Sequence, residues 1–286
     1  MGIERAGLRE MELRAEKLGA AASQWLRLFS NFIEVYRYRS LVWALVVRHL
    51  SIRYRGSVLG FLWTFLNPLC LMLVYTLVFK YYIRFDQVNN YTIFLFCGLL
   101  PWLWVQSSLI EGSSSVVGSG HLITKSMFPA QILPTVAVLI NLVNFALSLP
   151  LLFIFMLIAQ MELHWTLLAL PLLVIIQFFF LVGLSWVLGA LNVHFRDVQH
   201  IVGNLLTFLF FLCPILYPFE QVPERFRFTL ELNPFALYTM CYHALVLEGI
   251  LPSAGDLLLL GLYAIAALAL GDIVFNRYRE SFAELL

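Results

Sequence analysis

Side chains that could act in catalysis are scattered along this chain of 286 residues. Its six histidines stand apart, and the sequence holds neither an H-E-x-x-H zinc motif nor a G-x-S-x-G nucleophile motif. A phosphate-binding G-x-x-x-x-G-K-S/T loop is also missing. We therefore expect no catalytic residue, no metal site and no cofactor in this chain, so that any energy from ATP has to come from a partner.

Two carboxylates, Glu111 and Asp272, fall inside long apolar segments. Ionisable groups at membrane depth are typical of ion-coupled transporters. Both residues lie nearer to the end of a segment than to its middle, which favours interfacial carboxylates, with proton-coupled transport as the alternative. The four cysteines, at positions 70, 97, 213 and 241, have apolar neighbours and no paired spacing, so we expect buried thiols.

The composition indicates a membrane protein, because 61% of the residues are hydrophobic, 12% are charged and the mean hydropathy is +0.86. Six segments are long enough to cross a bilayer, which needs about 20 apolar residues. They span residues 60–83, 91–117, 134–160, 165–191, 201–217 and 254–274. The predicted fold is an all-α membrane protein with six transmembrane helices.

Lys and Arg are concentrated near the N-terminus, which predicts that both termini are cytoplasmic. This basic cluster adjoins a membrane span, so we expect no nucleic-acid binding. Residues 234–249 are too short for a further span, and we interpret them as part of a re-entrant hairpin. The expected parts are a lead over 1–31, an interface helix region over 32–59, a membrane domain over 60–274 that includes the hairpin at 219–248, and a tail over 275–286.

The segment before the first span is predicted to form an amphipathic helix in the headgroup region. Its apolar face would hold Trp43, Val46, Val47, Leu50 and Tyr54, opposite Arg48, Ser51 and Arg55. A mechanical role and a simple topology anchor are both open. Gly56 and Gly60 then form a small-xxx-small pair for close helix approach or a hinge, and Pro68 is expected to kink the first span.

Aromatic residues are frequent in the first and fifth predicted spans. Ring faces suit the C–H side of sugar rings, although many such residues only face acyl chains. The candidates for a channel lining are Trp63, Phe65, Tyr75, Phe208, Phe211 and Tyr217.

Four separated runs carry a family resemblance over about residues 37–280. They are RYRGSVLGFLWTFLNPLCLMLVYTLVF, KSMFPAQILP from Lys125, NVHFRDV from Asn192 and LNPFALY from Leu232. In order and spacing they resemble the permease subunit of polysaccharide ABC exporters, a family that includes O-antigen, teichoic acid and capsular exporters.

The resemblance implies a homodimer of six-span subunits in the bacterial cytoplasmic membrane, bound to two copies of a separate ATPase that holds ATP and Mg. It places the ATPase-coupling residues at Lys125, Met127, Phe128 and Pro129, with Arg196 and Asp197 near the same interface. It also makes the hairpin at 219–248 an outer gate.

The expected function is export of a lipid-linked polysaccharide, with undecaprenyl-diphosphate-linked O-antigen as the first candidate. Arg48, Arg53 and Arg55 could attract the diphosphate at the entrance, or instead hold anionic phospholipid headgroups. An ABC permease for small hydrophobic molecules or drugs is the main alternative, and an ion-driven lipid flippase is a weaker one.

Overall fold

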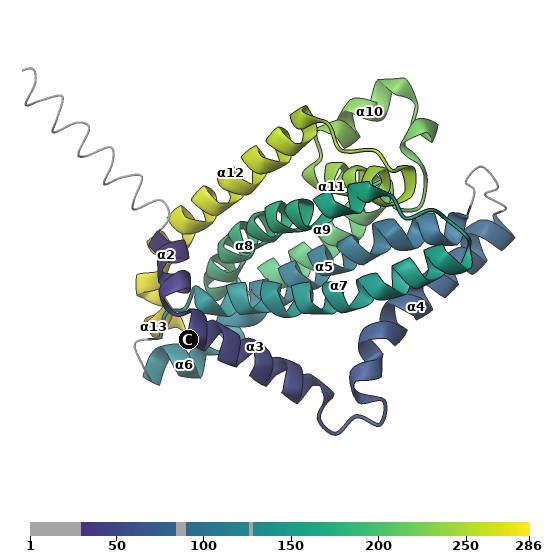
Figure 1. Cartoon of the computed structure of the whole chain (residues 1–286). Coiled ribbons are helices and arrows are strands. Elements are labelled where there is room, and N and C mark those ends of the chain that lie inside the picture. The colour runs from purple at the N-terminus through teal and green to yellow at the C-terminus, as the bar shows by residue number, and fades with distance from the viewer. Residues whose placement is uncertain (1–29, 84–89, 126–127) are drawn as a thin grey trace, which may run out of the picture.

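The computed structural model of the chain describes residues 30–83, 90–125 and 128–286. These residues form helices joined by turns, and no strand occurs among them (Figure 1). The all-helical prediction is confirmed for this part of the chain.

In chain order the helices are α2 (Ser30–Arg37), α3 (Arg39–Tyr54), η1 (Gly60–Leu62), α4 (Trp63–Thr76), η2 (Leu77–Tyr82), α5 (Tyr91–Gly118), α6 (Gly120–Lys125), α7 (Ile132–Ile158), η3 (Trp165–Ala169), α8 (Leu170–His194), α9 (Val198–Leu212), η4 (Phe219–Gln221), α10 (Glu224–Glu231), α11 (Pro234–His243), η5 (Ala244–Glu248), α12 (Ala254–Tyr278), η6 (Arg279–Ser281) and α13 (Phe282–Leu285).

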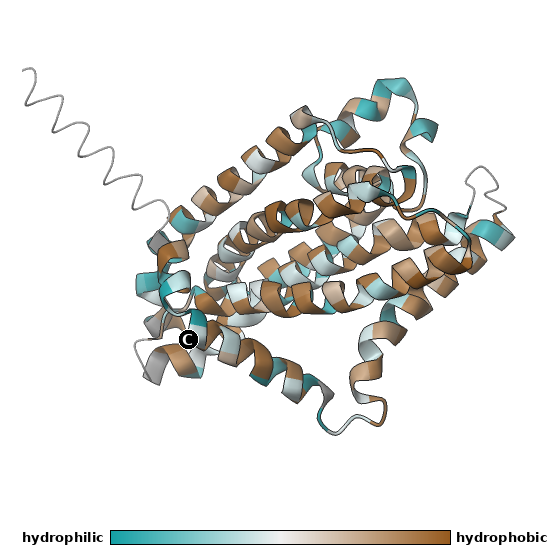
Figure 2. Ribbon diagram, viewed as in Figure 1, coloured by the Kyte–Doolittle hydropathy of each residue, from teal (hydrophilic) through white to brown (hydrophobic). Residues whose placement is uncertain are grey.

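Within the described residues, five helical segments are long and apolar enough to cross a membrane (Figure 2). They match five of the six predicted spans and are Gly60–Tyr82, Tyr91–Gly118, Ile132–Ile158, Trp165–His194 and Ala254–Ser281. The remaining predicted span, 201–217, overlaps α9 (Val198–Leu212), which has 15 residues. A helix of that length is about 22 Å long, shorter than a hydrocarbon core of about 30 Å. The sixth crossing therefore stays a prediction.

Helix α5 is the most enclosed of these segments, with 78% of its most apolar 18-residue window buried against 17% for the segment that contains α4. Trp104 on α5 stacks on Phe145 of α7 with ring centroids 5.2 Å apart. Its indole Nε1 also donates to the Val138 carbonyl at 3.3 Å. Because a buried indole N–H needs an acceptor, this bond fixes α5 against α7.

Helix α3 packs on α7 through a face that differs from the predicted one. The buried residues form two short rows, Val42, Leu45 and Val46 on α3 and Ile132, Val136 and Ile140 on α7. Trp43 is 64% exposed and Val47 is exposed as well, although both share the predicted apolar face with Val46. The helix is apolar on more than one side, so its sequence alone did not identify the side that meets the bundle.

The two ends of the bundle carry different elements. Helices α2, α6 and α13 lie at one end, whereas α10 and α11 lie at the other (Figure 1). At the first end, Glu34 of α2 pairs with Arg279 at 3.4 Å, which ties α2 to the end of α12. We call this the coupling end, after the ATPase-coupling role that the resemblance predicts for residues there.

The predicted gate hairpin forms η4, α10, α11 and η5. Asn233 caps α11, because its side-chain oxygen accepts a hydrogen bond from the Phe235 backbone N–H at 3.0 Å and Pro234 follows at the first helical position. Helix α11 has ten residues, in keeping with the prediction that this segment is too short to span. Its entry into the membrane from the far side stays a prediction.

Candidate functional site

A polar cleft of about 410 Å³ opens between the end of α3 and helices α4, α5 and α7. Its polar lining consists of Arg53, Thr64, Asn67, Ser107, Asn141, Asn144 and Ser148. Aromatic lining comes from Trp63, Trp104 and Phe145. Amides and hydroxyls beside aromatic faces can bind polar, ring-shaped ligands. Such polar groups also form hydrogen bonds between neighbouring membrane helices.

A hydrogen-bonded chain links three of these helices at the cleft. Arg53 at the end of α3 pairs with Glu111 of α5 at 3.2 Å. The second Glu111 oxygen accepts a bond from the Asn141 side chain of α7 at 2.8 Å. The Arg53 and Glu111 side chains are 45% and 37% exposed, so their pairing is worth about 0–1 kcal/mol. Because this ion pair is weak and accessible, a charged ligand can replace one residue of the pair as the partner of the other.

The turn between α3 and α4 positions Arg53 relative to the cleft. Gly56 and Gly60 have φ values of +82° and +46°, in the left-handed region that favours glycine. Nothing lies within 4 Å of a Cβ built on Gly56. Within this chain Gly56 therefore makes no close contact, and close helix approach and a hinge at this pair both stay predictions. Pro68 is buried inside α4 and lines the cleft.

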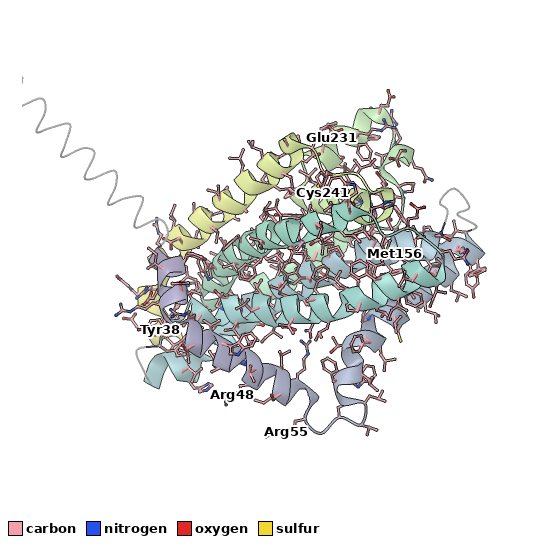
Figure 3. The ribbon with its side chains drawn as sticks, in the orientation of Figure 1. Tyr38, Arg48, Arg55, Met156, Glu231 and Cys241 are labelled. Atoms are coloured by element: carbon pink, nitrogen blue, oxygen red, sulfur yellow. The ribbon has the colours of Figure 1, made fainter. Side chains whose placement is uncertain are left out.

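The structure separates the three predicted entrance arginines. Arg53 lines the cleft, whereas Arg48 and Arg55 are exposed along α3 and at the turn that follows it (Figure 3). Sequence reasoning missed the amides Asn67, Asn141 and Asn144. Their signal was available, since each is an amide inside an otherwise apolar run.

Of the predicted channel aromatics, three lie on α4, two lie on α9 and Tyr217 lies in the turn after α9. Tyr75 stacks on Phe210 with ring centroids 5.6 Å apart, which joins the two helices. Phe208 is 64% exposed, and Phe211 is exposed beside it. Tyr217 donates its hydroxyl to the Phe211 carbonyl at 3.0 Å.

Two further predicted aromatics lie near the start of α4. Trp63 is exposed and lines the cleft, while Phe65 packs edge-on against Phe61 at 5.5 Å. The cleft and the exposed face of α9 are therefore separate surfaces.

The predicted ATPase-coupling residues gather at the coupling end. Phe128 packs against the cluster that α3 forms with α7, so it is half-buried. Pro129 beside it is also half-buried, and Lys125 ends α6. Met127 lies outside the described residues. Phe128 thus packs on the same hydrophobic cluster that joins α3 to α7.

The turn between α8 and α9 exposes Arg196 and Asp197. The tail is held at the same end, because the Ser281 hydroxyl bonds the His194 ring at 2.9 Å and the Tyr278 ring lies 4.5 Å from that histidine. The contacts between the tail and His194 therefore help to hold this turn in place, with its two charged residues exposed.

The second carboxylate that falls in an apolar segment, Asp272, is surrounded by protein hydrogen-bond partners. It is 2% exposed and accepts bonds from the Asn31 backbone N–H at 2.8 Å and from the Asn276 side chain at 2.9 Å. It is therefore buried within the protein near the end of α12, and its position relative to the membrane interface stays a prediction. Cys70 is exposed, unlike the other three cysteines, so the prediction of a buried thiol is wrong there.

Among the described residues, no group of three or more His, Cys, Asp or Glu side chains could hold a metal ion.

The sequence is similar to a known family and to known proteins. Residues 40–246 match the ABC-2 type transporter family. The chain is 44% identical over 253 residues to the O-antigen export system permease protein RfbA of Myxococcus xanthus, covering 88% of this chain and 97% of that protein.

Two more distant relatives have related names. An O-antigen export system permease protein RfbA of Klebsiella pneumoniae is 31% identical, covering 84% of this chain and 92% of the relative. The polysialic acid transport protein KpsM of Escherichia coli is 23% identical, covering 83% and 93%. The chain is thus a multi-pass membrane protein that belongs to the ABC-2 type transporter family, as a permease related to polysaccharide exporters.

Proposed function

We propose that this chain forms the channel of an ATP-driven exporter that moves a lipid-linked polysaccharide across the bacterial cytoplasmic membrane. An O-antigen linked to undecaprenyl diphosphate is the first candidate substrate. The observation that carries this proposal is the 44% identity, over 88% of the chain, to a protein named as an O-antigen export permease.

A separate ATPase would supply the energy, since this chain has no phosphate-binding loop of the G-x-x-x-x-G-K-S/T type. Helices α2, α6 and α13 group at one end of the bundle (Figure 1), and the bond between Ser281 and His194 holds the end of α8 there. This grouping supports a single docking surface for that partner. Phe128 would pass its movement to α3, because it packs on the cluster shared by α3 and α7.

The working unit would be a homodimer of six-span subunits with both termini in the cytoplasm and the hairpin at 219–248 as the outer gate. Helix α9, followed by the turn from Cys213 to Pro218, would supply the remaining crossing. Helices α4 and α9 expose large apolar side chains, among them Leu73, Val74, Ile201, Leu205 and Phe208. Two copies of this paired surface would form the walls of the channel.

Arg53 is the residue that we place at the substrate diphosphate. A guanidinium binds phosphate oxygens through charge-assisted bonds, and here it lines a cleft that also holds the side-chain amide of Asn67. The substrate would draw Arg53 away from Glu111, at a cost of about 1 kcal/mol or less for an exposed pair. Full export by the Arg53→Glu variant would contradict this role and favour a phospholipid headgroup as the ligand.

The first test is purification of the full chain with the ATPase encoded beside it, followed by mass determination of the intact complex. Two copies of each chain are expected, with ATP hydrolysis stimulated by an undecaprenyl-diphosphate-linked glycan. Stimulation by small amphiphiles but not by the glycan would favour a drug permease. Recovery of the chain alone, without nucleotide dependence, would favour an ion-driven flippase.

A matched pair of charge reversals tests the docking surface. Arg196→Glu alters an exposed residue at the coupling end, and Arg225→Glu alters an exposed residue on α10 at the other end. We expect the first variant to lose the ATPase during purification and the second to retain it. Equal retention would remove the turn between α8 and α9 from the docking surface.

A further inference from the structure

We propose that the coupling end carries a binding groove for an anionic glycerophospholipid. The groove lies between α2 and α3 on one side and α7 and α8 on the other, and has a volume of about 180 Å³. It is separate from the polar cleft, and its occupation does not depend on which substrate the permease moves.

The walls of the groove are apolar. Phe32, Val35 and Val42 line one side, while Leu139, Phe178 and Val182 line the other. Its volume suits a short length of acyl chain, and burial of each methylene is favourable by about 0.8 kcal/mol.

The polar atoms in the wall are already bonded to one another. The Trp186 indole donates to the Gln131 carbonyl at 3.1 Å and to the Thr135 hydroxyl at 3.0 Å. That hydroxyl donates in turn to the Gln131 carbonyl at 2.9 Å. The wall therefore offers no free polar group. An extended peptide would leave its backbone groups unsatisfied there, whereas a hydrocarbon chain would not.

The mouth of the groove is basic. The Arg39 guanidinium lies 5.2 Å from the centre of the Tyr36 ring, and both residues line the groove. Arg37 is exposed close by, in the last turn of α2. Within the described residues, neither arginine has a carboxylate within 4.0 Å. The acid on the same helix, Glu34, is bonded to Arg279 and to Gln131.

An anionic glycerophospholipid fits this groove, because its head group would lie at the basic mouth and its acyl chain would lie against the apolar wall. The other side of the groove is made of α7 and α8, which belong to membrane-spanning segments, so lipid is the solvent beside it. Basic residues near a membrane surface attract anionic lipids. A lipid seated there would join α2 and α3 to α7 and α8 and would help to set the position of the interface helix.

The binding test uses the purified full chain, freed of lipid, and titrated with phosphatidylglycerol or with zwitterionic phosphatidylcholine while bound lipid is counted by native mass spectrometry. Arg39→Gln should weaken phosphatidylglycerol binding about fivefold, as loss of one basic contact implies. It should leave phosphatidylcholine binding nearly unchanged. Arg277→Gln, an exposed arginine outside the groove, is the matched control. Equal losses in the two variants would show a general surface-charge effect and overturn the proposal.

Two further measurements test the groove itself. Leu139→Trp would fill it, and should reduce the binding of both lipids relative to Ile154→Trp, an exposed position elsewhere on α7. Unchanged binding by the folded Leu139→Trp protein would contradict the proposal. The wild-type chain can also be labelled by phosphatidylglycerol with a photoreactive acyl chain. Labels on the groove residues are expected, and their absence there would mean that another occupant, such as residues 1–29 or a second copy, covers the groove.

Discussion

Helices α8 and α12 touch backbone to backbone, and a single methyl group should force them apart. A Cβ on Gly183 would lie 2.3 Å from the Ala267 carbonyl carbon and 2.4 Å from the Leu268 nitrogen. A Cβ on Gly271 would lie 2.5 Å from the Gly183 carbonyl oxygen. Small residues allow such approach between membrane helices. The perturbation we choose is Gly183→Ala.

The expected cost follows from these distances. Non-bonded carbon atoms are most stable about 3.5–4.0 Å apart, so the helices must separate by about 1 Å. Overpacking of this kind costs about 1–3 kcal/mol. Alanine also gains up to about 1 kcal/mol over glycine in a helix, which opposes the loss. Gly261→Ala on α12 carries the same gain without a clash, because nothing lies within 4 Å of its Cβ. The difference between the two variants isolates the packing cost.

The assay is thermal unfolding of the two purified variants in one detergent. At about 2 °C per kcal/mol for a chain of 286 residues, Gly183→Ala should melt about 2–6 °C below Gly261→Ala. Equal melting temperatures would refute the close approach of α8 and α12. Gly271→Ala should lower the melting temperature in the same way, because its Cβ would clash at the same contact from the side of α12.

Three other predictions concern the cleft and the topology. Glu111→Gln should leave transport within about twofold of wild type, because the pair with Arg53 is exposed and worth about 1 kcal/mol or less; abolished transport would revive proton coupling. Cys70 should react with a polar maleimide and the other three cysteines should not, since it alone is exposed; no labelling would mean that the cleft is closed to water. In a Cys70→Ser background, an impermeant thiol reagent added to whole cells should label Glu231→Cys but not Glu280→Cys. The reverse pattern would invert the proposed orientation.

Much of the fold could be predicted because the length of an apolar run is a local property. Each of the five long segments begins within two residues of its predicted start, as at Gly60, Tyr91 and Ile132. The fifth predicted span shows where this reasoning stops. Residues 213–217 are apolar enough to extend α9, but the chain turns at Cys213 and the helix ends at Leu212. Prolines at positions 214 and 218 oppose continuation of the helix there.

The candidate site could be predicted only in part. Arg53 and Trp63 were both identified as candidates, but nothing local indicated that they share one cleft. Their partners Glu111 and Asn141 lie far along the chain on two other helices. Sequence spacing gives the face of a helix on which a residue lies, and it does not give the helix opposite.

By itself, the sequence determined that this chain is a helical membrane protein, where most of its long helices run and which family its motifs resemble. Those properties depend on composition, run length and short motifs. Only the tertiary structure decided that Val42, Leu45 and Val46 bury against α7 while Trp43 stays exposed, and that Arg53 meets Glu111. The physical reason is that lipid and protein interior are both apolar. A hydrophobic face therefore fits either one, and only complementary shapes and hydrogen-bond partners between helices decide between them.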